Sequence, residues 1–241
     1  MIDKPVAIVT GASRGIGRAI AEGLAADGYK TILMARSKDA LKRVGFEIVL
    51  KLSLEKALTP DLCALDVTDE ATVQSTLKQI VETYGRIDVL VNNAGQWLDG
   101  SLDAPTDQVR TLFDVNLLAP YVLLRAVVPL MKERGSGYLF NVASRAGTVG
   151  FPESGTYCAS KFALVGLSDS LHRELAPLGI RVTAICPGWV NTDMALEAGT
   201  SLAAGDMIQP ADIAQTIHYL LHLSPCVCIK EIVLGSHLST V

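Results

Sequence analysis

Tyr157 and Lys161 are two ionisable residues whose spacing could support proton transfer. They lie four positions apart in a segment with a helical pattern, so both side chains are expected on one face of the helix. A phenol is a poor acid–base group near neutral pH, but an adjacent ammonium favours the phenolate and lowers the pKa of the tyrosine. We therefore expect Tyr157 to give a proton to a carbonyl oxygen, or to take one from an alcohol, with Lys161 lowering its pKa.

Ser144 could hold the substrate for this proton transfer. It ends a predicted strand thirteen residues before Tyr157, and its hydroxyl can donate a hydrogen bond to the substrate oxygen. A serine after a strand and a Tyr/Lys pair are each common by chance. These residues therefore indicate catalysis only when they are considered together.

A glycine-rich turn follows the first predicted strand. Gly11, Gly15 and Gly17 have the spacing G-x-x-x-G-x-G, one residue longer in its first gap than the common dinucleotide-binding fingerprint. Such a turn lets the backbone approach a pyrophosphate, and the helix that follows offers free N–H groups and partial positive charge. The turn residues expected to bind a dinucleotide are Gly11, Ser13, Arg14, Gly15, Ile16 and Gly17.

The end of the second predicted strand distinguishes NAD from NADP. A carboxylate there would bind the ribose 2′-hydroxyl of NAD and repel the 2′-phosphate of NADP. The stretch from Met34 to Ser37 contains no acid, and the next one along the chain is Asp39. Arg36 can bind a phosphate through its guanidinium fork and stack on the adenine, and Arg14 is a second cation within reach. We therefore predict NADP as the cofactor.

Three motifs together resemble the single-domain short-chain dehydrogenase/reductase family. They are the glycine turn, the segment Asn92-Asn-Ala-Gly95 after the fourth predicted strand, and Tyr157-x-x-x-Lys161 at the start of a helix. The motifs occur in the family's order, and the resemblance covers the whole chain. It implies an oxidoreductase that transfers a hydride between NADP(H) and a ketone, aldehyde or alcohol.

The resemblance also implies roles for further residues. In the family, an asparagine at the position of Asn116 bends its helix and holds a water that links Lys161 to solvent, which completes a proton relay with Ser144 and Tyr157. Asn92 and Gly95 are expected under the ribose and nicotinamide, and Val190 and Thr192 on the carboxamide. The cofactor contacts implied beyond the glycine turn and Arg36 are Asp66, Val67, Asn93, Ala94, Gly95, Tyr157, Lys161, Pro187, Gly188, Val190 and Thr192.

Short apolar runs that alternate with helical patterns must position these residues. We expect strands at residues 6–10, 31–35, 62–66, 87–91, 138–142, 181–185 and 231–234. We expect helices from Ile16 to about Gly28, from about Ser37, from Asp69, and over 106–134, 154–178 and 210–223. This order predicts an α/β, Rossmann-like doubly wound parallel sheet of about seven strands with helices on both faces, in one domain over residues 1–241. Residues 44–60 lack clean periodicity, and residues 189–209 are predicted to form a mobile loop.

Composition and charge exclude several classes of protein. Of the 241 residues, 49% are hydrophobic and 19% charged, which excludes a disordered chain, and the net charge of −4 argues against a nucleic-acid binder. The sequence begins with no signal peptide pattern, and its apolar run at 121–131 is interrupted by Arg125 and Pro129. Five cysteines show no zinc-ligand spacing and are expected to be reduced. We expect a cytoplasmic protein without a membrane or nucleic-acid partner.

The sequence identifies the substrate less clearly than the cofactor, and two alternative functions stay open. We expect a moderately apolar pocket for a small carbonyl or alcohol, lined by Gln96, Trp97 and residues 145–151 and 189–206. A 3-oxoacyl-[acyl-carrier-protein] reductase of fatty acid synthesis is one alternative, for which Arg134 and Arg173 could meet an acidic carrier protein. Its usual Asp-Gly-Gly-like turn after the last strand is replaced here by Leu234-Gly-Ser-His237. The other alternative is a non-catalytic NADP-binding sensor of the same fold.

Two helices suggest contacts outside the fold. Residues 106–134 and 154–178 are more apolar than one buried face requires, and in the family these helices pair between subunits. We expect a homodimer or homotetramer. His218 and His222 have a spacing that could bind a metal, but no glutamate follows His218, so we expect an ordinary helix face and no metal.

Overall fold

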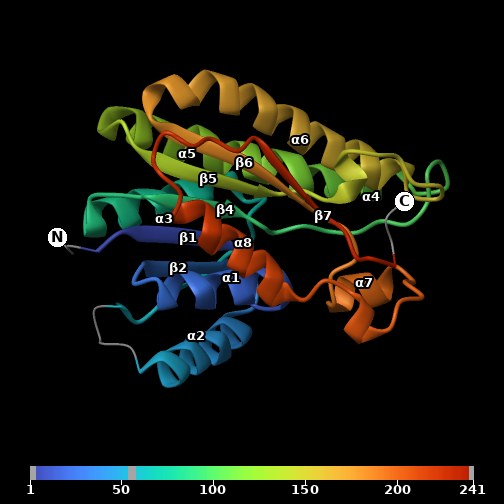
Figure 1. Ribbon diagram of the computed structural model, residues 1–241, viewed down its shortest axis with the longest axis horizontal. Coiled ribbons are helices and arrows are strands. Elements are labelled where there is room, and N and C mark those ends of the chain that lie inside the picture. The colour runs from blue at the N-terminus through green and yellow to red at the C-terminus, as the bar shows by residue number, and fades with distance from the viewer. Residues whose placement is uncertain (1–3, 54–57, 239–241) are drawn as a thin grey trace.

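The computed structural model describes residues 4–53 and 58–238, and its centre is one parallel sheet (Figure 1). The strand order is β3-β2-β1-β4-β5-β6-β7, and each pair of neighbours runs parallel. The strands are β1 (Val6–Thr10), β2 (Lys30–Ala35), β3 (Asp61–Ala64), β4 (Val89–Asn92), β5 (Gly137–Val142), β6 (Ile180–Pro187) and β7 (Glu231–Leu234). The prediction of a doubly wound parallel sheet of about seven strands is confirmed.

Helices cover both faces of the sheet (Figure 1). One face carries α1 (Gly15–Ala26), α2 (Lys38–Leu52) and α8 (Pro210–Leu221). The other carries α3 (Glu70–Tyr84), α5 (Ala119–Arg134) and α6 (Gly155–Leu175). Helix α4 (Thr106–Phe113) and the turn η2 (Asp114–Leu118) lead into α5, and Leu112 of α4 packs with Tyr157 of α6. Short helical segments complete the described chain: η3 (Arg145–Gly147), η4 (Ala176–Leu178), α7 (Asp193–Glu197) and η5 (Ala204–Asp206).

The central strands are buried on both sides because successive side chains point to opposite faces. In β1, Ala7 and Val9 pack with α1, α2 and α8, whereas Val6 and Ile8 pack with α3 and α5. This explains why the strands are short unbroken apolar runs rather than alternating ones. The strand order reverses between β1 and β4, and a ligand crevice is expected outside the carboxyl ends of the strands at such a reversal.

The region without clear periodicity is partly helical. Helix α2 continues to Leu52 and ends at Ser53, whose φ of 48° is left-handed. Its inner face is formed by Leu41, Val44 and Ile48, but Phe46 and Leu50 are 68% exposed on the outer face. Apolar residues on both faces hide the helical period. The rest of this region includes residues 54–57, which lie outside the described residues.

The segment after β6 is more regular than the loop we predict from sequence. It contains α7 and η5, and a parallel bridge pairs Val190 with Ile208. The Asn191 N–H donates to the Ile208 carbonyl at 2.8 Å, and the Asn191 side-chain amide donates to Gln209 at 3.1 Å. These contacts close the segment at its base.

The long helix predicted over 106–134 consists of three pieces. A π-helical turn, η2, separates α4 from α5 and contains Asn116. The run Thr106–Arg134 is long and apolar enough, by length and composition, to cross a membrane. It extends well beyond the apolar run at 121–131. Core helices of soluble proteins pass the same test. Here Leu112, Leu123 and Val127 are buried in the molecule, as expected for a helix that covers a sheet.

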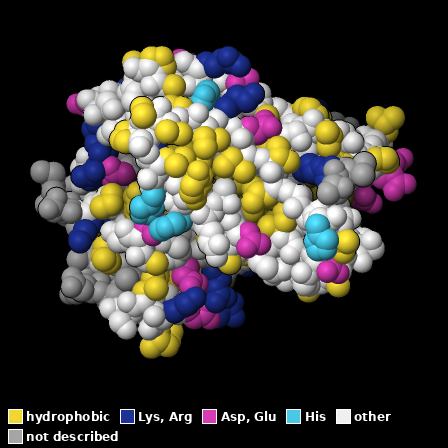
Figure 2. Space-filling model, viewed as in Figure 1, with side chains coloured by type: hydrophobic (Ala, Val, Ile, Leu, Met, Phe, Trp, Pro, Cys, Tyr) yellow, Lys and Arg dark blue, Asp and Glu magenta, His cyan; other side chains and the backbone are white. Residues whose placement is uncertain are grey.

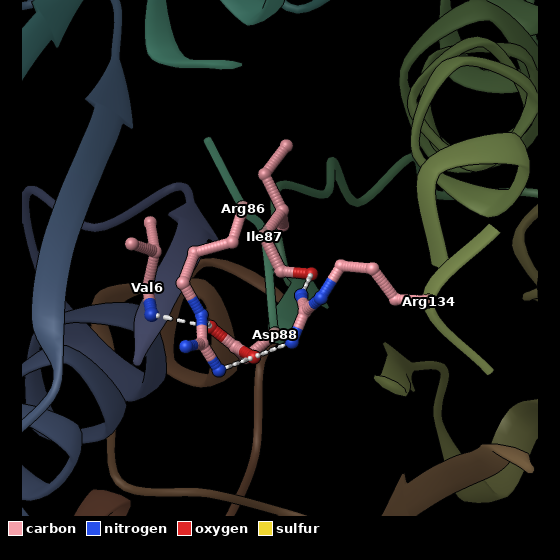
Figure 3. A network of polar contacts seen from close by, with 5 residues as sticks. All are labelled: Val6, Arg86, Ile87, Asp88 and Arg134. Carbon is pink, nitrogen blue, oxygen red and sulfur yellow. Dashed lines mark hydrogen bonds and ion pairs between the residues drawn. The ribbon is translucent and has the colours of Figure 1, made fainter. Parts of the chain in front are cut away.

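A network of charged side chains lies at the edge of the sheet where the strands begin (Figure 3). The Asp88 carboxylate accepts hydrogen bonds from the Val6 N–H, Arg86 and Arg134, and Arg134 also donates to the Ile87 carbonyl. Burial would raise the pKa of Asp88, but these hydrogen bonds outweigh it and hold the pKa below its usual range.

This network changes the interpretation of Arg134. Its guanidinium is engaged at the edge of the sheet opposite the carboxyl ends of the strands. The other arginine considered for a carrier protein, Arg173, pairs with Asp169 one turn earlier on α6. Neither arginine therefore lies at the carboxyl ends of the strands, where a ligand crevice is expected.

Candidate active site

A cleft of about 1590 Å³ opens at the carboxyl ends of the strands. Typical small-molecule pockets have volumes of about 300–1,000 Å³, so this cleft has room for a dinucleotide and a second molecule. Nearly all of the predicted site residues line it. The exceptions are Gly17, Asn92 and Asn116, which do not line the cleft.

The glycine turn has the conformation that its sequence predicts. Gly11 has a φ of 64° and Gly15 a φ of 52°, both in the left-handed region that favours glycine. A Cβ atom on Gly17 would lie 2.3 Å from the Gly11 carbonyl oxygen. Gly17 therefore permits close packing of α1 against the turn rather than contact with a ligand.

The N-terminus of α1 suits an anionic group. Arg14 occupies the N-cap position, and its side chain makes no capping hydrogen bond to the helix. The first N–H groups of α1 are thus available to a phosphate at the positive end of the helix dipole. The Arg14 guanidinium instead bonds Asp193 of α7 at 2.8 Å, a contact that the sequence pattern does not reveal.

Cations gather at the outer end of the cleft. Arg36, Ser37 and Arg43 line it where β2 meets α2, and Ser37 caps that helix. Across from them, hydrogen bonds from the Thr68 backbone and side chain hold the pKa of Asp66 below its usual range, and Arg36 adds to this effect. Arg43 was missed from the sequence. The available signal was helical spacing, because positions 40, 43 and 47 share the face of α2 that borders the cleft.

The proposed catalytic side chains meet at the inner end of the cleft. Tyr157 and Lys161 lie near the start of α6, and they are 8% and 4% exposed. Ser144 follows β5 and accepts a hydrogen bond from the Ala146 N–H at 3.1 Å. A hydrogen bond joins the side chains of Ser144 and Tyr157. Three residues that are up to 17 positions apart in sequence therefore share one corner of the cleft.

The expected lowering of the Tyr157 pKa is wrong for the chain by itself. Burial raises the pKa of Tyr157 to about 12, although the hydrogen bond with Ser144 opposes this shift. Burial also lowers the pKa of Lys161 to about 8. The Lys161 ammonium lies 5.7 Å from the Tyr157 ring centre and donates to the Val142 carbonyl at 3.2 Å. Desolvation is thus the largest effect on the pKa of each group.

Asn116 is fully buried and connects two parts of the site. Its side-chain amide donates to the Gln96 carbonyl and to Ser160 Oγ, both at 3.0 Å, and its oxygen accepts from the Gln96 N–H at 2.8 Å. Ser160 in turn donates to the Tyr157 carbonyl. The π-helical turn therefore ties the segment after β4 to α6. A Cβ on Gly95 would lie 3.5 Å from both Asn116 Oδ1 and Lys161 Nζ, so the two side chains flank one backbone position.

Asn92 does not lie where the resemblance implies. Its side-chain amide donates to Asn141 Oδ1 at 2.8 Å inside the sheet, and it does not line the cleft. Asn93, the next residue, lines the cleft and donates to the Thr10 carbonyl at 2.9 Å. The side chains of successive strand residues alternate in direction, which explains the difference.

A second loop contact was missed from the sequence. The Gly100 N–H donates to the Glu153 carbonyl at 2.7 Å, Thr156 Oγ1 donates to the Gly100 carbonyl at 3.0 Å, and the Gly155 N–H donates to Ser101 Oγ at 3.0 Å. Glu153 has a φ of 58°, which is strained for a residue other than glycine. We call these three hydrogen bonds the α6 clamp.

The clamp lies beside the substrate side of the cleft. Trp97, just before the clamped loop, stacks at a tilt on Tyr157 with ring centres 4.7 Å apart. Phe151 packs in the same small cluster. The predicted pocket wall at Trp97 and Phe151 is therefore adjacent to the phenol.

Comparisons with known proteins agree with this geometry. The family model described as short chain dehydrogenase matches residues 5–202. An uncharacterized oxidoreductase of Staphylococcus saprophyticus is 35% identical over 228 residues, which cover 94% of this chain and 95% of that protein.

Two solved structures are similar over almost their whole length. A betaketoacyl-[ACP] reductase from Bacteroides thetaiotaomicron is 48% identical with a TM-score of 0.87, and the match covers 98% of each chain. An alcohol dehydrogenase from the archaeon Thermococcus sibiricus, complexed with 5-hydroxy-NADP, is 30% identical with a TM-score of 0.89 over 99% of each chain.

Proposed function

Because the chain belongs to the short-chain dehydrogenase family of oxidoreductases, we propose that it interconverts a ketone or aldehyde and the corresponding alcohol with NADP(H). One observation carries this proposal: Ser144, Tyr157 and Lys161 line the same cleft as the glycine turn. A hydride donor and a proton donor can thus reach one substrate.

The residues of the cleft fit a phosphorylated dinucleotide. The glycines of the turn leave space that side chains would fill. A Cβ atom on Gly15, for example, would lie 3.1 Å from the side chain of Thr192. The uncapped start of α1 suits the pyrophosphate, and Arg36 and Arg43 suit a 2′-phosphate. The similar alcohol dehydrogenase was crystallised with an NADP derivative, which supports the same choice.

The chain's own groups would move and hold the proton. NADPH, when bound, supplies a hydride to the substrate carbonyl carbon. Burial keeps the Tyr157 phenol neutral, so its Oη holds a proton to give to the carbonyl oxygen. Ser144 Oγ would donate a hydrogen bond to the same oxygen and hold it beside Tyr157. We assign Lys161 and Asn116 to the relay that returns a proton to Tyr157.

The substrate is proposed to be a small, moderately apolar carbonyl compound. Trp97 and Phe151 pack around Tyr157, and Met194 also lines the cleft. A betaketoacyl-[ACP] reductase is a second candidate function, favoured by the 48% identity to such an enzyme. The sequence after β7 argues against this candidate, because Gly235-Ser236 replaces the Asp-Gly-Gly-like turn that is usual in such reductases. Ser236 instead donates a hydrogen bond to the Asp206 carbonyl at 2.7 Å.

One screen tests the function and separates the candidates. Absorbance at 340 nm is followed with NADPH or NADH and a panel of aldehydes, ketones and β-ketoacyl thioesters. We expect saturable turnover with NADPH and much weaker turnover with NADH. Preference for β-ketoacyl thioesters would establish the second candidate. Tight NADPH binding with no turnover across the panel would favour a non-catalytic sensor.

We also propose a cytoplasmic homodimer or homotetramer. The five cysteines, all in the described part of the chain, are free thiols, which is typical of a reducing compartment. An apolar groove lies between α5 and α6, and Tyr121 and Phe162 on these helices are each 45% exposed. These apolar surfaces support pairing of the two helices with those of a second subunit.

A further inference from the structure

Asp27, His218 and His222 meet on the surface where two helices end. Asp27 is the C-cap of α1 and His222 is the C-cap of α8, and His218 lies in the last turn of α8. One ligand atom from each residue can be chosen so that all three lie within 4.8 Å of one another. Figure 2 shows two histidine side chains side by side next to an acidic one on this face.

The hydrogen bonds of the two histidines determine which nitrogen lone pairs are available. His222 Nδ1 lies 2.8 Å from the His218 carbonyl oxygen, which can only accept, so Nδ1 carries the proton and Nε2 keeps its lone pair. Metal-binding histidines commonly donate their other ring N–H to a backbone carbonyl in this way. His218 Nδ1 lies 2.8 Å and 2.9 Å from the two Asp27 oxygens, which can only accept, so this nitrogen carries a proton. A metal ion held between Nδ1 and the carboxylate would take the place of that proton and release it to water.

The helix ends favour positive charge at this place. Carbonyl groups at a helix C-terminus carry partial negative charge, and α1 and α8 both end here. Arg181 already donates to the Leu220 carbonyl at 3.3 Å, so one cation is present at the end of α8. A divalent ion would add charge where Asp27 and the two helix ends are negative.

We propose that Asp27, His218 and His222 bind a divalent transition metal ion of the zinc type. Two imidazoles and one carboxylate are a common ligand set for Zn²⁺, and histidines at i and i+4 on one helix face can share an ion. Water would complete a tetrahedral site. Ligand atoms in such a site are about 3.3 Å apart. The His218 and His222 rings must therefore close in, and as His218 is 54% exposed and His222 is also exposed, they have room to do so.

This site is separate from the cleft. Helix α1 begins at the glycine turn and ends at the metal ligand Asp27, so about 18 Å of helix lies between them. The ion would join the ends of α1 and α8 and stabilise the layer that covers one face of the sheet. The sequence showed only the histidine pair, because Asp27 is 191 residues away from His218.

Zinc titration of protein without an affinity tag, freed of metal with EDTA, tests the proposal. The starting chain carries Cys226→Ser and Cys228→Ser, because these exposed thiols could bind zinc themselves. Calorimetry should give about one Zn²⁺ per chain. The melting temperature should rise by roughly 5–10 °C when free zinc is about 100 times the Kd, and Mg²⁺ should have no such effect.

Variants assign the ligands. His222→Gln keeps the Asp27–His218 contact and should weaken zinc binding by at least about 10-fold, and Asp27→Asn should do the same. His237→Gln, an exposed histidine outside the cluster, should bind zinc as the starting chain does. Melting temperatures in EDTA report whether each variant is folded. Absence of zinc binding, or binding that survives His222→Gln and Asp27→Asn undiminished, would overturn the proposal.

Discussion

Burial governs the acid–base behaviour of Tyr157 and Lys161. It favours the neutral form of each side chain, so the phenol keeps its proton and the ammonium loses its proton more readily than in water. The sequence reveals the spacing of the pair but not how deeply α6 is buried. Proximity alone therefore predicted the wrong direction for the pKa of Tyr157.

The pKa of Lys161 leads to a prediction about pH. Lysine is charged below its pKa, which burial lowers to about 8. If the relay needs the ammonium, kcat/KM for carbonyl reduction should be level below pH 8 and fall as the pH rises above it. Lys161→Arg keeps its charge at higher pH, so this fall should move upward in whatever activity remains. A fall at the same pH in both proteins would assign it to another group.

Arg36 should determine the preference for NADPH. Loss of a charge-assisted hydrogen bond to phosphate costs about 1.5–3 kcal/mol, so Arg36→Ala should raise the KM for NADPH roughly 10- to 100-fold. The KM for NADH should hardly change. Arg173→Ala removes an arginine paired with Asp169 away from the cleft and serves as the matched control. Equal effects on both cofactors would contradict the role of Arg36.

Among the elements, the helices that carry the site depend on distant partners. The N-cap residue of α6, Ser154, makes no side-chain capping bond, and Ser101 supplies one from a loop 54 residues earlier. Asn116 is held by a π-helical turn that the apolar pattern of 106–134 does not distinguish from a continuous helix. Sequence periodicity predicts that these helices exist, but not the hydrogen bonds that fix their ends.

Ser101→Ala tests the α6 clamp. Loss of a capping hydrogen bond costs about 0.5–2 kcal/mol, so the melting temperature should fall by a few degrees. Because the clamp lies next to Tyr157, we expect kcat to fall while the KM for NADPH is unchanged. Ser75→Ala on α3, far from the clamp in sequence and exposed, is the control for loss of a serine hydroxyl. Identical kinetics in the two variants would contradict a positioning role for Ser101.

For the whole molecule, the order of strands could be predicted because its physical causes are local. Short β-branched runs, glycine turns and amphipathic helices alternate along the chain, and a parallel sheet is what such an order forms. Contacts between distant side chains could not be predicted in this way. Arg14 with Asp193 and His218 with Asp27 join segments more than 170 residues apart, and nothing in the sequence pattern marks them as partners.

The apolar groove between α5 and α6 predicts an assembly of subunits. Light scattering after size exclusion should give two or four times the chain mass of 25.6 kDa. Val128→Asp would place a charge in the groove, so it should shift the protein toward monomers without unfolding it. Leu178→Asp, at an exposed position outside the groove, should leave the assembly intact. A single species of one chain mass in the unaltered protein would contradict this expectation.

The phenol of Tyr157 is the group on which the proposed chemistry depends, and its removal is the most direct measurement. Tyr157→Phe keeps the ring beside Trp97 but leaves no proton at the carbonyl oxygen. With the best substrate of the screen, NADPH oxidation at 340 nm should fall by several orders of magnitude, while NADPH binding stays nearly unchanged. A variant that retains most of its turnover would contradict the account.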